Sequence, residues 1–209
     1  MNRSSRAFAG RVAWWLMLPP ILYFLWRDVP RYADYSAAAY LEYWPTRGYL
    51  ILHLLGAGVG ILAGMLQFSA TLRGRWPAFH RRLGWAYVAG ALLGAPAALG
   101  LAAHSSCVAC RPALGSLAVY WFCTTLIAFL LARRRDLLRH RDFMLRSFVA
   151  MNVFVIVRFA YMTSVPGLDD TQHRIAAEYL SVFVPLLAVE MALAWRGLRR
   201  APSAGLGRP

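Results

Sequence analysis

The sequence predicts an all-α membrane protein, a bundle of six transmembrane helices with both termini in the cytoplasm. Of its 209 residues, 59% are hydrophobic, and most of these lie in six apolar stretches. A helix of about twenty residues rises about 1.5 Å per residue and crosses a hydrocarbon core of about 30 Å. All 23 basic residues are Arg, most of them between the stretches. No segment alternates as a β-strand does, and backbone polar groups in lipid must be satisfied within the segment, so a helical bundle follows.

The six stretches leave only loops and short tails, so we expect a single transmembrane domain over residues 1–209. In chain order, the predicted spans cover residues 12–26, 48–70, 83–103, 112–132, 147–165 and 175–195. The first is short and follows a basic tail, as the apolar part of a signal peptide does. Pro19-Pro20 and the apolar run after them favour an uncleaved helix, with Ser36-Ala37-Ala38-Ala39 as the remaining candidate for a cleavage site.

The second and third spans are rich in small residues. Gly60 and Gly64 have the G-x-x-x-G spacing in the second span, and Gly90 and Gly94 repeat it in the third. Small residues let helix backbones approach closely. We therefore expect these two spans to form a tight hairpin in the interior of the bundle.

Polar side chains also occur within the spans, where ionisable groups are costly and indicate function by default. Three are placed toward the outer face: His53, Arg158 and Glu178. Three are placed nearer the cytoplasm: Gln67, Asn152 and Glu190. We expect Arg158 and Glu178 to form a buried pair. Gln67 and Asn152 are interpreted first as hydrogen-bonding groups that hold helices together.

The arginines predict the topology. They concentrate in the N-terminal tail, in the gaps after the second and fourth spans, and in the C-terminal tail, whereas the other gaps are poor in Arg or balanced by acidic residues. Short basic loops stay in the cytoplasm, so both termini are placed inside. The net charge of +14 is thus a topology signal and not one of nucleic-acid binding. The lipid bilayer is the expected partner, and a protein partner or a second copy is left open. An all-Arg basic set suggests a GC-rich genome and hence a bacterial inner membrane.

His80 and His140 are the candidate cofactor ligands. Each stands at the cytoplasmic start of a span and is followed by an arginine, Arg81 or Arg141. Imidazole ligates metals and haem iron, and the adjacent guanidinium groups suit carboxylates such as haem propionates. The alternative is that both are interfacial histidines in basic loops that meet lipid headgroups.

The two inner loops match each other at an offset of sixty positions. The matching residues are Arg73 with Arg133, Arg75 with Arg135, and His80-Arg81 with His140-Arg141. This pattern indicates a repeated helical hairpin, the second and third spans against the fourth and fifth. Coincidence in an arginine-rich chain is the competing explanation.

Two of the three cysteines lie in a short outer loop. Cys107 and Cys110 face the compartment where disulfides persist, so we expect a disulfide or a redox pair. With His104 they also have the spacing of a metal site, but Arg111 stands where a c-type haem motif has His. Cys123, within the fourth span, is interpreted as a packing residue.

Several of these motifs occur together in a known family. They are His53-Leu-Leu-Gly56, Gly64-Met-Leu-Gln67-Phe68, Arg73, His80-Arg81-Arg82-Leu83-Gly84 with Tyr87, and His140-Arg141-Asp142-Phe143-Met144-Leu145-Arg146-Ser147 with Arg158. Over residues 49–195 the chain resembles the bacterial membrane family called domain of unknown function 2306. The resemblance implies an integral membrane protein and no particular activity.

A looser resemblance is to the six-helix transmembrane b-type cytochromes that pass electrons from ascorbate to ferric iron. In that group, histidines on alternate helices of a four-helix bundle hold two haems. His80 and His140 match one such pair, but the fourth span has no histidine to complete the second. The resemblance therefore implies at most one haem.

Three functions remain open at this stage, and whether the protein is an enzyme is undecided. The first is a membrane redox protein that holds one b-type haem or a quinone through His80 and His140. The second is a small transporter with a polar path at His53, Arg158 and Glu178. The third is a non-catalytic membrane subunit that stabilises a partner complex.

Overall fold

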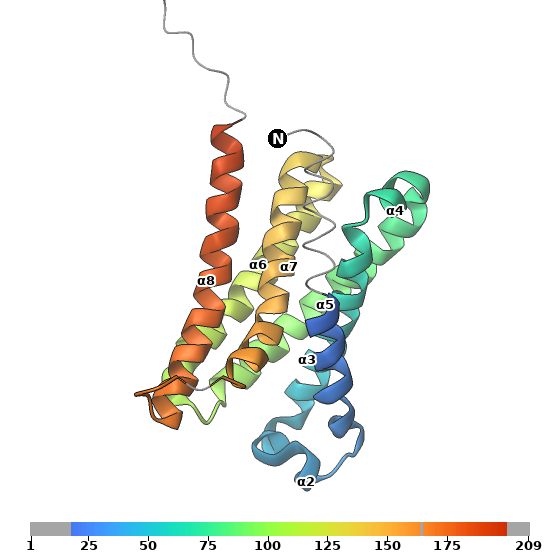
Figure 1. Ribbon diagram of the computed structural model, residues 1–209. Helices are drawn as coiled ribbons and strands as arrows, with labels where there is room; N and C mark the ends of the chain where they lie inside the picture. The colour runs from blue at the N-terminus through green and yellow to red at the C-terminus, as the bar shows by residue number, and fades with distance from the viewer. Residues whose placement is uncertain (1–17, 164, 200–209) are drawn as a thin grey trace, which may run out of the picture. The chain divides into compact units, whose positions relative to one another are not determined.

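The computed structural model describes residues 18–163 and 165–199, and every regular element in these two ranges is helical (Figure 1). Five helical segments in this part are long and apolar enough to cross a membrane: Ala37–Gln67, Pro77–Ala103, Val108–Arg133, Leu137–Ala160 and Asp170–Leu198. The prediction of an all-helical protein with several spans is confirmed. The first predicted span, 12–26, lies partly outside the described residues, and its described part belongs to a helical stretch, 18–27. The topology prediction depends in part on the arginines of the two tails, and most of these also lie outside the described residues.

The chain forms two compact units, residues 1–47 and 48–209. Besides the helical residues 18–27, the described part of the first unit contains η1 (Pro30–Ala33), α2 (Ala37–Tyr40) and η2 (Leu41–Thr46). Its aromatic side chains cluster: Tyr40 meets Tyr35 and Trp44 edge-on, with ring centroids 5.7 and 5.9 Å away. The Arg47 guanidinium lies over the Trp44 ring at 4.5 Å. Clustered Tyr and Trp are typical of the membrane–water interface.

In the second unit, α3 (Arg47–Gln67) and α5 (Pro77–Ala103) pack against each other through glycine. A Cβ placed on Gly56 of α3 would lie 2.7 Å from the backbone nitrogen of Gly94 in α5, so there is no room for a side chain at this crossing. The tight hairpin expected from the small residues is therefore present. Between the two helices lies the short α4 (Ala70–Arg75), whose first turn is capped by Ser69. Pro77 suits the first turn of α5 because an amide there has no intrahelical partner.

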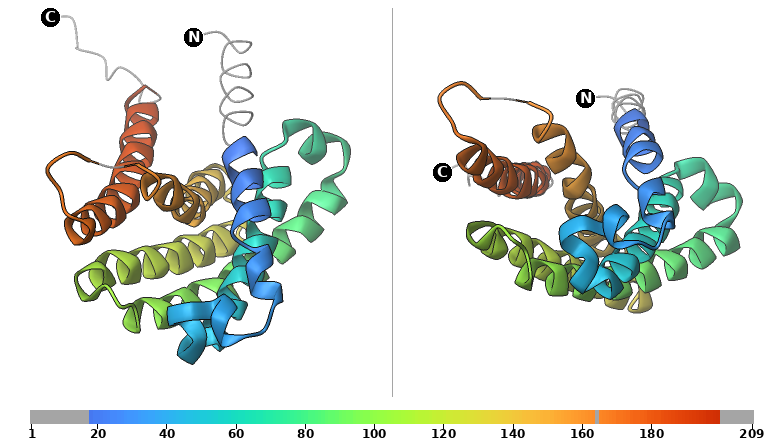
Figure 2. Two further views of the ribbon diagram at one scale, coloured as in Figure 1. Left: turned by 60° about the horizontal axis from the view of Figure 1, so that its bottom comes forward. Right: turned by 90° about the horizontal axis from the view of Figure 1, so that it is seen from below.

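The remaining helices are α6 (Arg111–Arg133), α7 (Leu137–Ala160) and α8 (Asp170–Leu198). α6 packs against both α5 and α7, and α8 packs against α7. In Figures 1 and 2, α7 lies between α8 and α3. Both α7 and α8 begin at an aspartate whose side chain accepts from a backbone amide, Asp136 and Asp169. Their shared core with α6 consists of Ala113, Val153, Val157 and Val182.

The outer surfaces of these helices carry large apolar side chains. Leu55 of α3, Leu93 of α5 and Leu187 of α8 are 63%, 61% and 61% exposed. Exposed leucines along helices that are long enough to cross a membrane are expected where these helices contact lipid.

Two helix boundaries differ from the predicted spans. α5 begins at Pro77 and α7 at Leu137, whereas the apolar runs begin at 83 and 147. The helices start in the basic segments because backbone hydrogen bonding continues outside the hydrocarbon, where arginine side chains extend toward water. At its other end α7 stops at Ala160, so the described residues 161–163 and 165 of the fifth predicted span are not helical.

Candidate functional site

His80 and His140 occupy equivalent places, each the fourth residue of its helix, α5 or α7. The two rings lie close enough to interact electrostatically. Nδ1 of His140 donates to the Ala128 carbonyl of α6 at 2.8 Å. Nδ1 of His80 is buried without a hydrogen-bond partner. The structure therefore places two histidines that are sixty positions apart within electrostatic range of each other.

The surroundings of the histidine pair are basic. Arg81 and Arg141 are exposed, and the positive charges of Arg73 and Arg81 act on the His80 ring. Across the described residues, no group of three or more His, Cys, Asp or Glu side chains is placed to hold a metal ion. A metal bound at His80 and His140 would thus have two protein ligands, the number that a haem with two axial histidines uses.

A buried hydroxyl network joins α5, α6 and α7. The Ser147 hydroxyl lies 2.7 Å from the Tyr87 hydroxyl and 2.6 Å from the Thr125 hydroxyl. Thr125 also donates to the Trp121 carbonyl at 2.8 Å, and none of the three hydroxyl-bearing side chains is exposed to solvent. We did not predict this network. The repeat contained the only signal for it, since Tyr87 and Ser147 each follow a histidine of the pair by seven residues.

Three of the predicted intramembrane polar residues bind backbone carbonyls. His53 donates through Nδ1 to Gly94 at 3.1 Å, and Gln67 donates to the His80 carbonyl at 2.6 Å, so both connect α3 with α5. Asn152 donates to Phe148, one turn earlier in its own helix. The contacts of His53 and Gln67 are of the kind that hold helices together in lipid, whereas the hydrogen bond of Asn152 stays within α7 and does not link helices as expected.

Arg158 and Glu178 do not form the expected ion pair. The Glu178 carboxylate accepts a hydrogen bond from the Tyr161 hydroxyl, just beyond the end of α7. The Arg158 guanidinium lies over the Phe154 ring at 4.9 Å, one turn back along α7. Nε of Arg158 and Oε2 of Glu178 are both buried without a hydrogen-bond partner. No hydrogen bond or ion pair between described residues links Arg158, Glu178 and His53, the three side chains of the predicted polar path.

Glu190 has an unexpected partner. Arg146 of α7 binds its carboxylate through two hydrogen bonds of 2.6 and 2.7 Å, and the Tyr120 hydroxyl of α6 donates to it at 2.9 Å. A fifth span that begins at 147 leaves Arg146 in the basic gap before it, and nothing in the sequence distinguishes Tyr120. This placement of Arg146 is wrong because α7 begins ten residues before its apolar run, so Arg146 lies within the helix.

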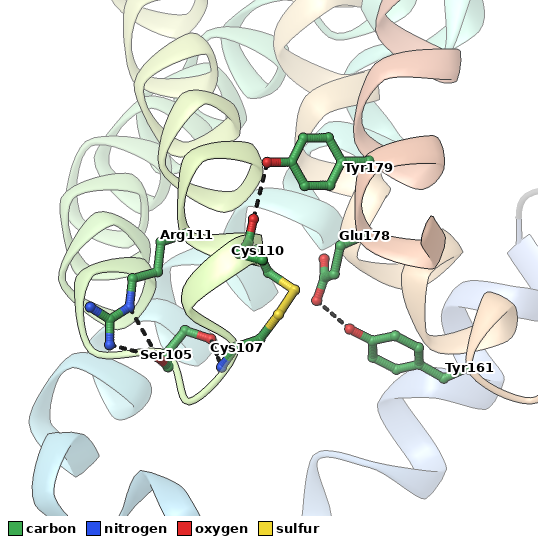
Figure 3. The surroundings of a disulfide bond; sticks show 8 residues. Ser105, Cys107, Cys110, Arg111, Tyr161, Glu178 and Tyr179 are labelled. Carbon is green, nitrogen blue, oxygen red and sulfur yellow. Dashed lines mark hydrogen bonds between the residues drawn. A yellow bond between two sulfur atoms is a disulfide. The ribbon is translucent and has the colours of Figure 1, made fainter. Parts of the chain in front are cut away.

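Cys107 and Cys110 are joined by a disulfide where α6 begins (Figure 3). Cys110 is fully buried, whereas Cys107 is partly exposed. Arg111 donates to the Ser105 carbonyl through Nε and Nη2, at 3.1 and 2.9 Å, and so fixes the loop before the disulfide. From α8, the Tyr179 hydroxyl donates to the carbonyl of Ala109, between the two cysteines, at 3.0 Å.

Comparison with known proteins gives one match. The model of a family described as "Predicted membrane protein (DUF2306)" matches residues 50–194, which is more than half of the chain. No curated protein and no solved structure matches the chain.

Proposed function

The chain belongs to the DUF2306 family of predicted membrane proteins, and we propose that it is a membrane redox protein that holds one b-type haem through His80 and His140. The observation that carries this proposal is that two histidines, each in the first turn of its helix, α5 or α7, lie within range of an electrostatic interaction. A bound haem supplies one-electron chemistry, and the protein positions it through the two imidazoles.

The hydrogen bonding of the pair supports ligation. A metal-ligating histidine commonly donates its other ring N–H to a carbonyl, which sets the tautomer and the ring orientation. His140 donates Nδ1–H to Ala128 in this way, and that leaves its Nε2 as the ligand. His80 has a buried Nδ1 without a hydrogen-bond partner, and a bound group would relieve the cost of that polar atom.

The surroundings also suit the carboxylates of a haem. Arg81 and Arg141 directly follow the two ligands and are exposed, so their guanidinium groups are free to turn toward propionates. The hydroxyl network of Tyr87, Ser147 and Thr125 lies seven residues, or about 10 Å, farther along α5 and α7. It connects α5 and α7, which carry the two histidines, with α6, which carries the carbonyl partner of His140.

We expect the purified protein, expressed with ample haem supply, to show a reduced-minus-oxidised haem spectrum. His80→Ala and His140→Ala should each abolish the spectrum, because each removes one of the two imidazoles that would hold the haem. His104→Ala and His173→Ala, which alter histidines outside the pair, serve as controls and should retain it. Arg81→Gln with Arg141→Gln should lower haem occupancy without abolishing the spectrum.

The same preparations decide between ligands. Gel filtration of each variant separates loss of ligand from loss of fold. A colourless, iron-free wild-type protein that also fails to take up added haemin would overturn the haem assignment. Extraction of a quinone from that protein, lost in His80→Ala, would assign the pair to a quinone.

The proposed topology has six spans, with both termini and the histidine pair on the cytoplasmic side of a bacterial inner membrane. Reporter fusions after Arg82, after Leu138 and at Pro209 should therefore be cytoplasmic, and fusions near Ser106 and Asp170 periplasmic. Arginine-rich gaps stay inside, and an even number of crossings returns the chain to its starting side. An external reporter at Pro209 would exclude six spans with an internal N-terminus.

A further inference from the structure

We propose that the Cys107–Cys110 disulfide is a thiol–disulfide exchange site that oxidises dithiols in other proteins, with Glu178 as the group that exchanges a proton with Cys110. The site is separate from the histidine pair. Cys110 lies eighteen residues before Ala128, the partner of His140 in α6, a distance of about 27 Å along the helix. This proposal does not depend on a bound haem.

The first argument is the unequal exposure of the two cysteine residues. Cys107 is partly exposed and Cys110 is fully buried, so the sulfur of Cys110 is closed to an incoming thiolate. Exchange of this kind requires access to the attacked sulfur and a defined leaving group. Between the cysteines, Val108 is 66% exposed and offers an apolar contact for a peptide.

The second argument is that the disulfide does little for the fold. It closes a loop with only two residues between the cysteines, and the chain-entropy stabilisation by a disulfide rises with loop length. The segment is also attached without it: Tyr179 holds the Ala109 carbonyl, and Arg111 holds the Ser105 carbonyl. A structural staple is thus not needed at this place.

The third argument is the carboxyl group of Glu178. Its side chain is 6% exposed; one oxygen accepts from Tyr161, and Oε2 is buried with no hydrogen-bond partner. Figure 3 shows Glu178 and Tyr161 in the surroundings of the disulfide. An unpartnered buried carboxyl oxygen is costly, and a carboxyl group in the surroundings of the disulfide is placed to take part in proton transfer.

The packing below the disulfide agrees with this placement. Ala113, Val157 and Val182 lie together in the core shared by α6, α7 and α8. Each of them has a residue of the proposed site one helical turn away, toward the disulfide loop. These are Cys110 before Ala113, Tyr161 after Val157 and Glu178 before Val182. The three helices therefore bring the buried sulfur, the tyrosine hydroxyl and the carboxyl group to one level.

In the reaction, a substrate thiolate attacks Sγ of Cys107, and the bond between Cys107 and Cys110 breaks. Cys110 leaves as a thiolate and takes a proton from the Glu178 carboxyl. The second substrate thiolate then attacks the substrate sulfur of the mixed disulfide and releases Cys107, which takes a proton from water. The substrate loses two electrons and two protons and gains a disulfide, and the two cysteines become thiols. A second disulfide compound reoxidises them by the reverse steps, in which the Glu178 carboxylate accepts the proton of Cys110.

The test uses the full-length protein in nanodiscs and a peptide with two cysteines as the dithiol probe. We expect the folded wild-type protein to oxidise one peptide per chain, seen by mass, and to acquire two thiols that react with maleimide. Cys110→Ala should form a mixed disulfide with glutathione disulfide through Cys107. Cys107→Ala should react about a hundredfold more slowly, because the remaining thiol is buried.

Glu178→Gln tests the proton transfer, and Glu190→Gln in the same helix is its matched control. The charged and titratable groups around Glu178 are Arg158 of α7, Tyr161 just after α7 and Arg174 of α8. Reduction of the disulfide adds the thiol of Cys110, which precedes α6. Loss of the carboxyl should slow exchange about a hundredfold and alter the dependence of its rate on pH, whereas Glu190→Gln should leave both unchanged.

Three results would overturn the proposal. One is a disulfide that the dithiol reduces only after the protein unfolds, which is the behaviour of a structural link. Another is equal reactivity of the two single-cysteine variants. The third is a Glu178→Gln variant that exchanges at the wild-type rate with the wild-type pH profile. Gel filtration must show that all variants are folded.

Discussion

Replacing Gly56 with Ala is expected to lower the free energy of unfolding by about 3 kcal/mol, the upper part of the range for overpacking a tight interface. The added Cβ would meet the Gly90 carbonyl oxygen and, at 2.7 and 2.8 Å, the backbone nitrogen and Cα of Gly94. All three atoms belong to the α5 backbone, so no side chain is able to turn away. The helices α3 and α5 would have to separate, which would also weaken the hydrogen bond from His53 to Gly94.

Two other glycines of α3 provide matched controls for this substitution. Gly58 has nothing within 4 Å of the added Cβ, so Gly58→Ala should leave stability unchanged or raise it slightly. Gly60→Ala should lie between the two, because its Cβ meets only Sδ and Cε of the flexible Met151. Thermal unfolding in one detergent ranks the three variants. Equal stability of Gly56→Ala and Gly58→Ala would contradict the close crossing.

Breaking the pair between Arg146 and Glu190 is expected to give the second large effect. A double-mutant cycle with Arg146→Met and Glu190→Gln should yield a coupling energy of about 1–2 kcal/mol. The two hydrogen bonds of 2.6 and 2.7 Å form a bidentate contact, which is the strong form of this interaction. The side chains are 19% and 44% exposed, so the coupling stays below the 3–5 kcal/mol of a fully buried pair.

Arg139 offers a control of the same residue type in the same helix. Its Nε lies 3.6 Å from Asp136 at the exposed start of α7, and this side chain is 76% exposed. Arg139→Met should therefore change the free energy of unfolding by less than about 0.5 kcal/mol. If the single changes at Arg146 and Glu190 simply add in the cycle, the two side chains do not interact in the membrane.

Features that depend on local sequence were predictable. Five predicted spans correspond to observed long helices because an apolar stretch of about twenty residues in lipid must satisfy its own backbone hydrogen bonds. The close approach of α3 and α5 was also predictable from their small residues, although the crossing uses Gly56 with Gly90 and Gly94, while Gly60 and Gly64 lie nearest to Met151 and Phe148 of α7. Cys107 and Cys110 were predictable as partners because only two residues separate them.

The candidate sites depended on contacts between helices, and sequence spacing does not specify these. Depth in the membrane suggested Arg158 as the partner of Glu178, but Tyr161 reaches that carboxylate instead. Arg146 pairs with Glu190, forty-four residues away, because α7 begins early and turns that arginine toward α8.

The sequence by itself determined which segments cross the membrane, since the transfer of apolar and charged residues between water and lipid is a property of each segment. Only the tertiary structure decided which polar groups meet: Tyr87 with Ser147, Arg146 with Glu190, and Tyr161 with Glu178. The physical reason is that a hydrogen bond extends only about 3 Å and depends on direction. Its partners are therefore set by the distance and rotation of whole helices, which the small residues at their crossings control.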